Sequence, residues 1–212
     1  MNDLRLCLAL ALLAFLKAPP ATAQALPGPN ARKAEAARLE ALVETDKGSF
    51  VIGLLGDVAP HHVAYFAATA RKGGYDGTTF HRIIPGGIIQ GGDPLSKDPA
   101  KKALYGTGGL TRQAPWTLKA ELSSRDMLRG SVAAVLLPGK PDSAGAQFFI
   151  CLSDQAALTG KYTIFGEVTS GMAVADAIGT TPVEGDKASV RVEIKKVTIR
   201  NADSEPAGAV AP

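Results

Sequence analysis

The sequence predicts a mainly β fold, an antiparallel barrel with helices covering its ends. Three observations indicate this class: apolar residues recur in short strand-like runs, only two stretches have helical spacing, and Gly-rich turns separate the runs. The chain has 212 residues and is 46% hydrophobic, which is enough for one well-buried domain of ordinary size.

The first segment, residues 1–23, is expected to be a signal peptide. Arg5 lies in a short charged start, an apolar stretch follows from Leu6 to Leu16, and Ala21-Thr22-Ala23 has the small-x-small pattern of a signal-peptidase site. The apolar stretch is short for a bilayer span, so a retained membrane anchor is the less favoured alternative. We therefore expect export to the periplasm, with no stable membrane insertion after cleavage.

Composition divides the rest of the chain into three parts. Residues 24–39 are rich in Ala, Pro, Gly and Arg and predict a linker, while residues 201–212 have no periodicity and predict a disordered tail. Between them, residues 40–200 form one expected domain without an internal repeat.

The domain is expected to begin with two strands and a helix. Residues 41–55 contain two strand-like runs about a short turn at Asp46-Lys47-Gly48. Residues 59–74 then change period, with apolar residues at i, i+3, i+4 and i+7 from Val63, so a helix with one apolar face is predicted there. Pro60 suits its first turn.

Strands are expected to dominate the remainder. The predicted strands are residues 80–90, 130–137, 146–152, 161–168 and 189–200, with a short helix at 172–178. In the last strand the apolar alternation slips between Ile194 and Val197, which predicts a bulge near Lys195-Lys196.

Several kinds of chemistry lack their usual residues. The formal net charge is only +3 and no Lys/Arg block stands out, so nucleic acid is not an expected partner. No metal-binding, phosphate-cradle or nucleophile-elbow motif occurs, so no metal and no cofactor are predicted. His61 and His62 are expected at a solvated helix start, and Cys151 as a small buried hydrophobe rather than a nucleophile.

One stretch is unusual for an ordinary strand. "FHRIIPGGIIQGGDP", residues 80–94, is apolar and β-branched but contains Arg82 and Gln90. These two are eight residues apart, an even number, so a regular strand would place both side chains on one face. A bulge at Pro85-Gly86-Gly87 would break that inference.

This stretch and four later segments together resemble a cyclophilin, the cyclosporin-binding class of peptidyl-prolyl cis–trans isomerase. The other segments are "GTGG" (106–109), "RGSVAAV" (129–135), "SAGAQFFI" (143–150) and "LTGKYTIFGEVTSGMAVADAI" (158–178). The similarity runs from Leu42 to about Ile199. It implies a mainly β fold, a closed eight-stranded antiparallel barrel capped by two α-helices, that acts on proline-containing polypeptides without a cofactor.

The resemblance also implies a role for each site residue. Arg82 would donate hydrogen bonds to the prolyl carbonyl and nitrogen, and Gln90 would steady Arg82. Gln147 would bind the substrate backbone. The remaining substrate-binding positions are Phe149 as a wall of the proline pocket, Leu158 and Tyr162 at its rim, Ile88, and Leu136 through its backbone.

Several positions depart from the family pattern, and three of them bear most directly on what the pocket can bind. Gly87 stands where an aromatic wall is usual, and Ala157 replaces the tryptophan associated with cyclosporin binding. Leu136 replaces an asparagine whose backbone usually contacts the substrate, and a leucine can still offer its backbone there. We therefore expect an isomerase of reduced efficiency that assists folding of exported proteins and is monomeric by default. A non-catalytic or weakly catalytic module or chaperone that binds proline segments is the alternative.

Overall fold

The computed structural model describes residues 38–109 and 118–202. The expected signal peptide, most of the linker and most of the tail lie outside these residues. Within them, strand β1 begins at Leu39 and pairs along its length with β10, which ends at Asn201.

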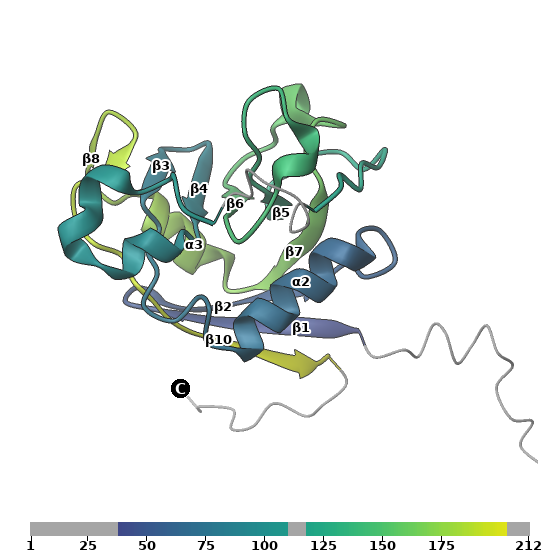
Figure 1. Ribbon diagram of the computed structural model, residues 1–212, viewed down its shortest axis with the longest axis horizontal. Coiled ribbons are helices and arrows are strands. Elements are labelled where there is room, and N and C mark those ends of the chain that lie inside the picture. The colour runs from purple at the N-terminus through teal and green to yellow at the C-terminus, as the bar shows by residue number, and fades with distance from the viewer. Residues whose placement is uncertain (1–37, 110–117, 203–212) are drawn as a thin grey trace, which may run out of the picture. The chain divides into compact units, whose positions relative to one another are not determined.

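A single antiparallel sheet forms the domain (Figure 1). Its ten strands follow the order β10-β1-β2-β7-β5-β6-β4-β3-β9-β8. The strands are β1 (Leu39–Thr45), β2 (Gly48–Leu54), β3 (Arg82–Ile84), β4 (Ile88–Gly91), β5 (Ser131–Ala134), β6 (Phe148–Cys151), β7 (Ile164–Ser170), β8 (Val183–Glu184), β9 (Lys187–Ala188) and β10 (Ile194–Asn201).

The mainly β, antiparallel class is confirmed, but the closed eight-stranded barrel is not. The strand order has two ends, β10 and β8, so the ladders do not close within the described residues. An isolated antiparallel bridge between Thr79 and Glu193 joins the chain before β3 to the chain before β10. The described residues form ten strands rather than eight, and the two shortest, β8 and β9, make a hairpin of two residues per strand.

The two predicted α-helices are both present, as α2 (Pro60–Arg71) and α3 (Met172–Gly179). Helix α2 packs on β10 and β7, and α3 on β2 and β4 (Figure 1). Four short 3-10 helices, which the sequence patterns do not predict, lie in the connections: η1 (Pro94–Lys97), η2 (Pro99–Leu104), η3 (Pro141–Ser143) and η4 (Ala156–Leu158).

The first hairpin and the bulge in the last strand are confirmed. Buried Phe50, Ile52 and Leu54 alternate along β2, as a strand with one face on the core requires. In the β1–β10 ladder, Glu44 pairs with Lys196 and Thr45 with Ile194. Lys195, between Ile194 and Lys196, is not paired with any residue of β1 in this ladder, and this unpaired residue is the predicted bulge.

The start of α2 corrects the expectation for its histidines. His62 is buried rather than solvated, because it lies four residues before Phe66 on the face that packs on the core. Both oxygens of the Glu121 carboxylate accept backbone N–H groups of His61 and His62, each at 3.0 Å, and Nδ1 of His62 lies 2.6 Å from Oε2. A carboxylate from a distant loop therefore caps this helix.

Residues 80–90 are not one strand, which corrects the basis for pairing Arg82 with Gln90. Pro85-Gly86-Gly87 reverses the chain, so β3 and β4 form a hairpin and Arg82 lies directly opposite Gln90. Gly86 takes φ +69°, which only glycine adopts at little cost. Residues opposite each other across a ladder share a face of the sheet, so the two side chains do meet, but as a cross-strand pair.

Two clusters of buried side chains hold the fold together. The larger one contains Phe66, Phe148 and Phe165, with the Phe66 and Phe165 ring centroids 5.3 Å apart. The smaller cluster includes Phe149 and Cys151 on the opposite face of β6. Phe148 and Phe149, adjacent residues of β6, therefore pack into different clusters on opposite faces of the sheet. None of the described helices is long and apolar enough to cross a bilayer.

Candidate active site

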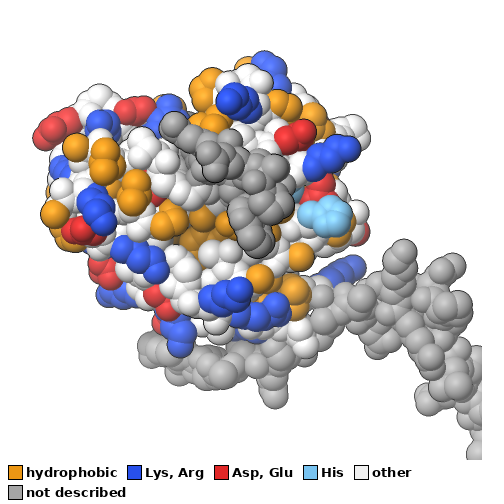
Figure 2. Space-filling model, viewed as in Figure 1, with side chains coloured by type: hydrophobic (Ala, Val, Ile, Leu, Met, Phe, Trp, Pro, Cys, Tyr) orange, Lys and Arg blue, Asp and Glu red, His pale blue; other side chains and the backbone are white. Residues whose placement is uncertain are grey.

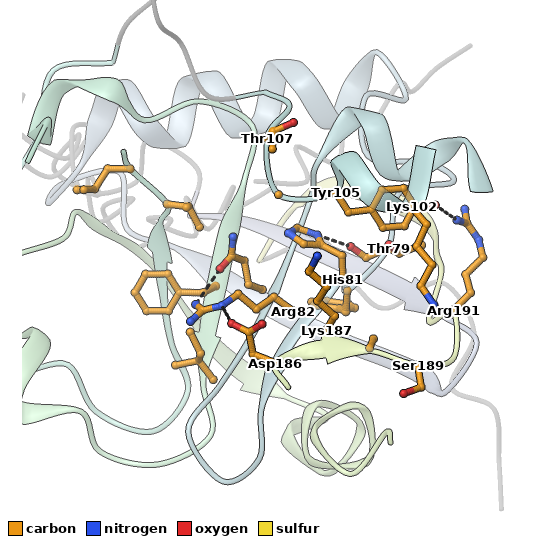
Figure 3. Close-up of a pocket in the computed structure, with 18 of the residues that line it drawn as sticks. Thr79, His81, Arg82, Lys102, Tyr105, Thr107, Asp186, Lys187, Ser189 and Arg191 are labelled. Atoms are coloured by element: carbon orange, nitrogen blue, oxygen red, sulfur yellow. Dashed lines mark hydrogen bonds and ion pairs between the residues drawn. The ribbon is translucent and has the colours of Figure 1, made fainter. Parts of the chain in front are cut away.

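A pocket of about 630 Å³ opens over β3, β4 and β6 (Figure 3). Its walls differ on the two sides of Arg82. The "apolar half" consists of Ile88, Val135, Leu136, Phe149, Leu158 and Tyr162. The "basic half" consists of His81, Lys102, Tyr105, Lys187, Ser189 and Arg191.

The apolar half is backed by the smaller core cluster. Phe149 is only 4% exposed, and it packs with Ile88 among the buried residues of that cluster. The rings of Phe149 and Tyr162 meet edge to face, with centroids 5.2 Å apart and planes at 86°. Since this wall is fixed by core packing, it is already shaped to accept a small apolar ring.

Arg82 lies at the boundary between the halves and is held from two sides. Its Nε donates to Oδ2 of Asp186 at 2.6 Å, and its Nη1 donates to Oε1 of Gln90 at 3.3 Å. Nε2 of Gln90 in turn donates to Oε1 of Gln147 at 2.9 Å. The Arg82 side chain remains 38% exposed, so the guanidinium is restrained but still open to the pocket.

The Gly-rich loop explains why Gln147 is held in place. Nε2 of Gln147 donates to the carbonyl of Gly108. Asp93, fully buried, accepts the backbone N–H groups of Gly106 and Gly108 and so fixes the loop. A Cβ at Gly108 would lie 2.3 Å from Oδ1 of Asp93, which excludes a side chain there. The two glycine-containing motifs therefore support one chain of hydrogen bonds that ends at Arg82.

Asp186 is the site residue that the sequence patterns did not identify. It lies in the turn of the β8–β9 hairpin, and β9 pairs with β3 so that Lys187 stands opposite Arg82. The hydrogen bond from Arg82 lowers the pKa of the Asp186 carboxyl, so it is ionised at neutral pH. Gly185-Asp186 between short β-capable residues is a hairpin signal that could have located the turn, though not its contact with Arg82.

The residues that line the pocket carry more positive than negative charge. Four residues that line the whole pocket are cationic and one, Asp186, is anionic. Arg82 is paired with Asp186 and Arg191 with Glu193, whereas Lys102 and Lys187 have no ion-pair partner among the described residues. Burial lowers the pKa of His81, so this ring is neutral at physiological pH and adds no positive charge.

Seven of the eight residues expected at the site line the pocket. They are Arg82, Ile88, Gln90, Leu136, Phe149, Leu158 and Tyr162. Gln147 lies behind the residues that line the pocket and is only 1% exposed. Its amide oxygen accepts a hydrogen bond from Gln90, and its amide nitrogen donates one to the carbonyl of Gly108. Its direct contact with substrate stays a prediction, and the contacts it makes here support Gln90.

Gly87 and Ala157 do not line the pocket. A Cβ at Gly87 would meet Cγ2 of Ile84 at 3.0 Å, and the backbone there does not need a positive φ. Ala157 is exposed in η4, next to Leu158.

The cysteine is confirmed as a buried apolar residue. Burial raises the pKa of Cys151 to about 12, so the thiol stays protonated and is a poor nucleophile. Among the residues that the structure describes, no three His, Cys, Asp or Glu side chains gather as possible metal ligands.

Comparisons relate the chain to known proteins. The family model described as "Cyclophilin type peptidyl-prolyl cis-trans isomerase/CLD" matches residues 41–199. A protein of Neurospora crassa named peptidyl-prolyl cis-trans isomerase-like 1 is 36% identical over 77% of this chain and 96% of its own. A probable peptidyl-prolyl cis-trans isomerase of Brucella suis is 38% identical over 65% of this chain and 69% of its own.

A solved structure is similar as well. The cyclophilin-type isomerase of Cryptosporidium parvum, crystallised in the presence of the dipeptide Ala-Pro, superposes with a TM-score of 0.68 at 28% identity. The similarity covers 76% of this chain and 99% of that one.

Proposed function

Since the chain belongs to the family of cyclophilin-type peptidyl-prolyl cis–trans isomerases, we propose that its pocket accelerates rotation about X–Pro bonds in exported polypeptides. Amide resonance opposes this rotation with a barrier of about 18–20 kcal/mol. Lowering it requires no nucleophile or cofactor, only a grip on the proline ring and a hydrogen-bond donor that favours the twisted amide.

The apolar half binds the proline ring. The ring of the substrate proline packs against Phe149 and Ile88, with Leu158 and Tyr162 at the rim. The backbone N–H and carbonyl of Leu136 have no hydrogen-bond partner among the described residues, and they can pair with the residue before the proline. These contacts are made with both the planar and the twisted amide, so they set affinity more than rate.

Arg82 supplies the donor. Asp186 occupies its Nε–H and Gln90 one Nη1 proton, which leaves the other guanidinium protons for substrate. As the amide twists, the nitrogen lone pair becomes localised and accepts a hydrogen bond that the planar amide cannot accept. An interaction stronger in the transition state than in the ground state raises kcat.

The observation that carries the proposal is the restrained guanidinium of Arg82 beside a pre-formed apolar wall. A protease-coupled assay with a proline peptide tests it, comparing the protein with Arg82→Ala. Turnover that depends on Arg82 supports catalysis. Peptide binding without turnover would instead favour a non-catalytic module or chaperone that holds proline segments.

Export is a separate part of the proposal and rests on the N-terminal segment. The charged start, apolar stretch and Ala-Thr-Ala of residues 1–23 favour cleavage after Ala23 and a periplasmic enzyme. N-terminal sequencing of protein from the periplasmic fraction tests it. A chain that still begins at Met1 in the membrane fraction would contradict it.

A further inference from the structure

The pocket is larger than a proline ring needs. A volume of about 630 Å³ is in the range that accommodates a whole drug-sized ligand, which corresponds to several residues of peptide. The ring itself occupies only the apolar half. Residues flanking the proline must therefore lie along the basic half, and its chemistry bears on which substrates are preferred.

The basic half presents two lysines, Lys102 and Lys187, that form no ion pair with another described residue, although the charge of Lys187 helps to lower the pKa of the neighbouring Asp186 carboxyl. Lys102 comes from η2 and Lys187 from β9, and Figure 3 shows both side chains reaching toward the space between His81 and Arg191. Neither forms an ion pair with another described residue, in contrast to Arg82 and Arg191. Ser189 adds a hydroxyl to the same wall.

The distance from the reacting bond is short. Lys187 stands opposite Arg82 in the β3–β9 ladder, and paired Cα atoms in antiparallel ladders lie about 4.5–5.5 Å apart. Because an extended peptide advances about 3.3–3.6 Å per residue, a side chain within about three positions of the proline reaches this lysine.

We propose, on the basis of the function above, that the basic half is a subsite for an acidic residue flanking the proline. The preferred substrates are then X–Pro segments that carry Asp or Glu within a few positions of the proline. A carboxylate there gains two ammonium partners, while a Lys or Arg side chain at the same position is repelled. The lysines are exposed, so each pair should contribute about two- to fivefold in affinity, and salt should weaken the effect.

The test uses a series of proline peptides that differ only in having Glu, Gln or Lys at one flanking position. Isomerisation is followed by NMR exchange, which avoids the sequence preference of a coupling protease. We expect Glu peptides to have a KM about four- to twenty-fivefold lower than Gln peptides at low salt, and the difference to shrink at about 0.15 M salt, where the Debye length is about 8 Å.

A double variant, Lys102→Ala with Lys187→Ala, should lose this preference, so that its KM values for Glu and Gln peptides become equal. Lys196→Ala, which removes an exposed lysine of β10 outside the pocket, is the matched control and should keep the preference. Equal KM values for Glu and Gln peptides in the unmodified protein, or a preference that survives in the double variant, would overturn the subsite while the isomerase activity stands. Absence of turnover for every peptide would instead overturn the proposed function, and the subsite with it.

Discussion

The two halves of the pocket are built in different ways. The apolar half rests on β4 and β6, in the interior of the sheet order, and its central ring belongs to a buried core cluster. The basic half rests on a two-residue strand near the end of the sheet order and on a 3-10 helix, with both free lysines exposed. Ring binding is therefore tied to stability, whereas charge recognition can change with little effect on the fold.

Figure 2 shows charged side chains of both signs on one face of the molecule. On the face in view, Lys and Arg side chains are interspersed with Asp and Glu rather than gathered in one field. A preference for acidic substrates then depends on the few cations at the pocket, and not on long-range steering. Arg82, at the boundary of the two halves, is the residue where a substitution should separate rate from binding.

The largest effect is expected for Arg82→Ala. In the proposed mechanism Arg82 acts mainly on the twisted amide, so kcat should fall about ten- to a thousandfold, which corresponds to about 1.4–4 kcal/mol of transition-state stabilisation. Steady-state kinetics with a proline peptide measure it. Arg71→Ala, an exposed arginine at the end of α2, is the control. A KM change with normal kcat would mean that Arg82 only binds the ring.

Leu158→Ala tests the apolar half. Loss of about half of the buried surface of one leucine should raise KM about sevenfold and leave kcat nearly unchanged. Leu128→Ala removes a similar side chain that is exposed and outside the pocket. A fall in kcat would instead mean that the apolar half stabilises the twisted amide more than the planar one, which contradicts the proposed role of this half in binding alone.

Asp186→Asn tests how the hairpin positions Arg82. The two side chains are 38% and 48% exposed, so solvent weakens the pair, and we expect kcat to fall about two- to fivefold. Asp186→Glu should recover part of the loss, and Glu184→Gln in the same hairpin should have no effect.

The pH dependence of this pair follows from the sign of the shift. The folded-state pKa of Asp186 is lower than in the unfolded chain, so the pair stabilises the fold above the ordinary carboxyl pKa. That contribution is lost as pH falls through the lowered folded pKa. With His81 neutral and Cys151 protonated, kcat should stay flat from mildly acidic to mildly basic pH. An inflection of kcat in the mildly acidic range would indicate that protonation of His81 affects the reaction.

Gly87→Phe should have a smaller effect. Gly87 lies outside the pocket lining but directly precedes Ile88 of the apolar half, so a Phe side chain that extends over Ile88 adds apolar surface at the edge of that half, and we expect KM to fall about threefold with kcat unchanged. The added Cβ requires Ile84 to move by a few tenths of an ångström, and a thermal melt checks that the hairpin tolerates it. A stable variant with unchanged KM would show that the ring never packs near position 87.

Ala157→Trp should change turnover least. Ala157 is exposed outside the pocket, so kcat and KM for small peptides should stay within about twofold of the original values. Cyclosporin should bind the original protein weakly and the variant more tightly, because an indole restores a donor and apolar surface at the rim. Tight binding by the original protein would contradict the role assigned to this position.

Local patterns in the sequence determined most of the framework. Alternation and helical spacing depend only on neighbouring residues, so they located the first hairpin, both helices and the bulge at Lys195. The motif at residues 80–94 also identified Arg82 and Gln90 as partners. The even spacing of eight residues was the wrong basis for that pairing, because it assumed one continuous strand. Pro85-Gly86-Gly87 forms a hairpin turn instead, and the two residues lie opposite each other on separate strands.

Only the tertiary structure decided the surroundings of Arg82. Asp186 is 104 residues away from it in sequence, and the carboxylate reaches the guanidinium because a two-residue strand docks on β3. The same docking brings Lys187 to the pocket, while hydrogen bonds with Gln90 and Gly108 hold Gln147 behind the pocket wall. Sequence periodicity reports which face of a strand is buried, but it carries no information on which distant strand becomes the neighbour, and that neighbour sets the charge at this site.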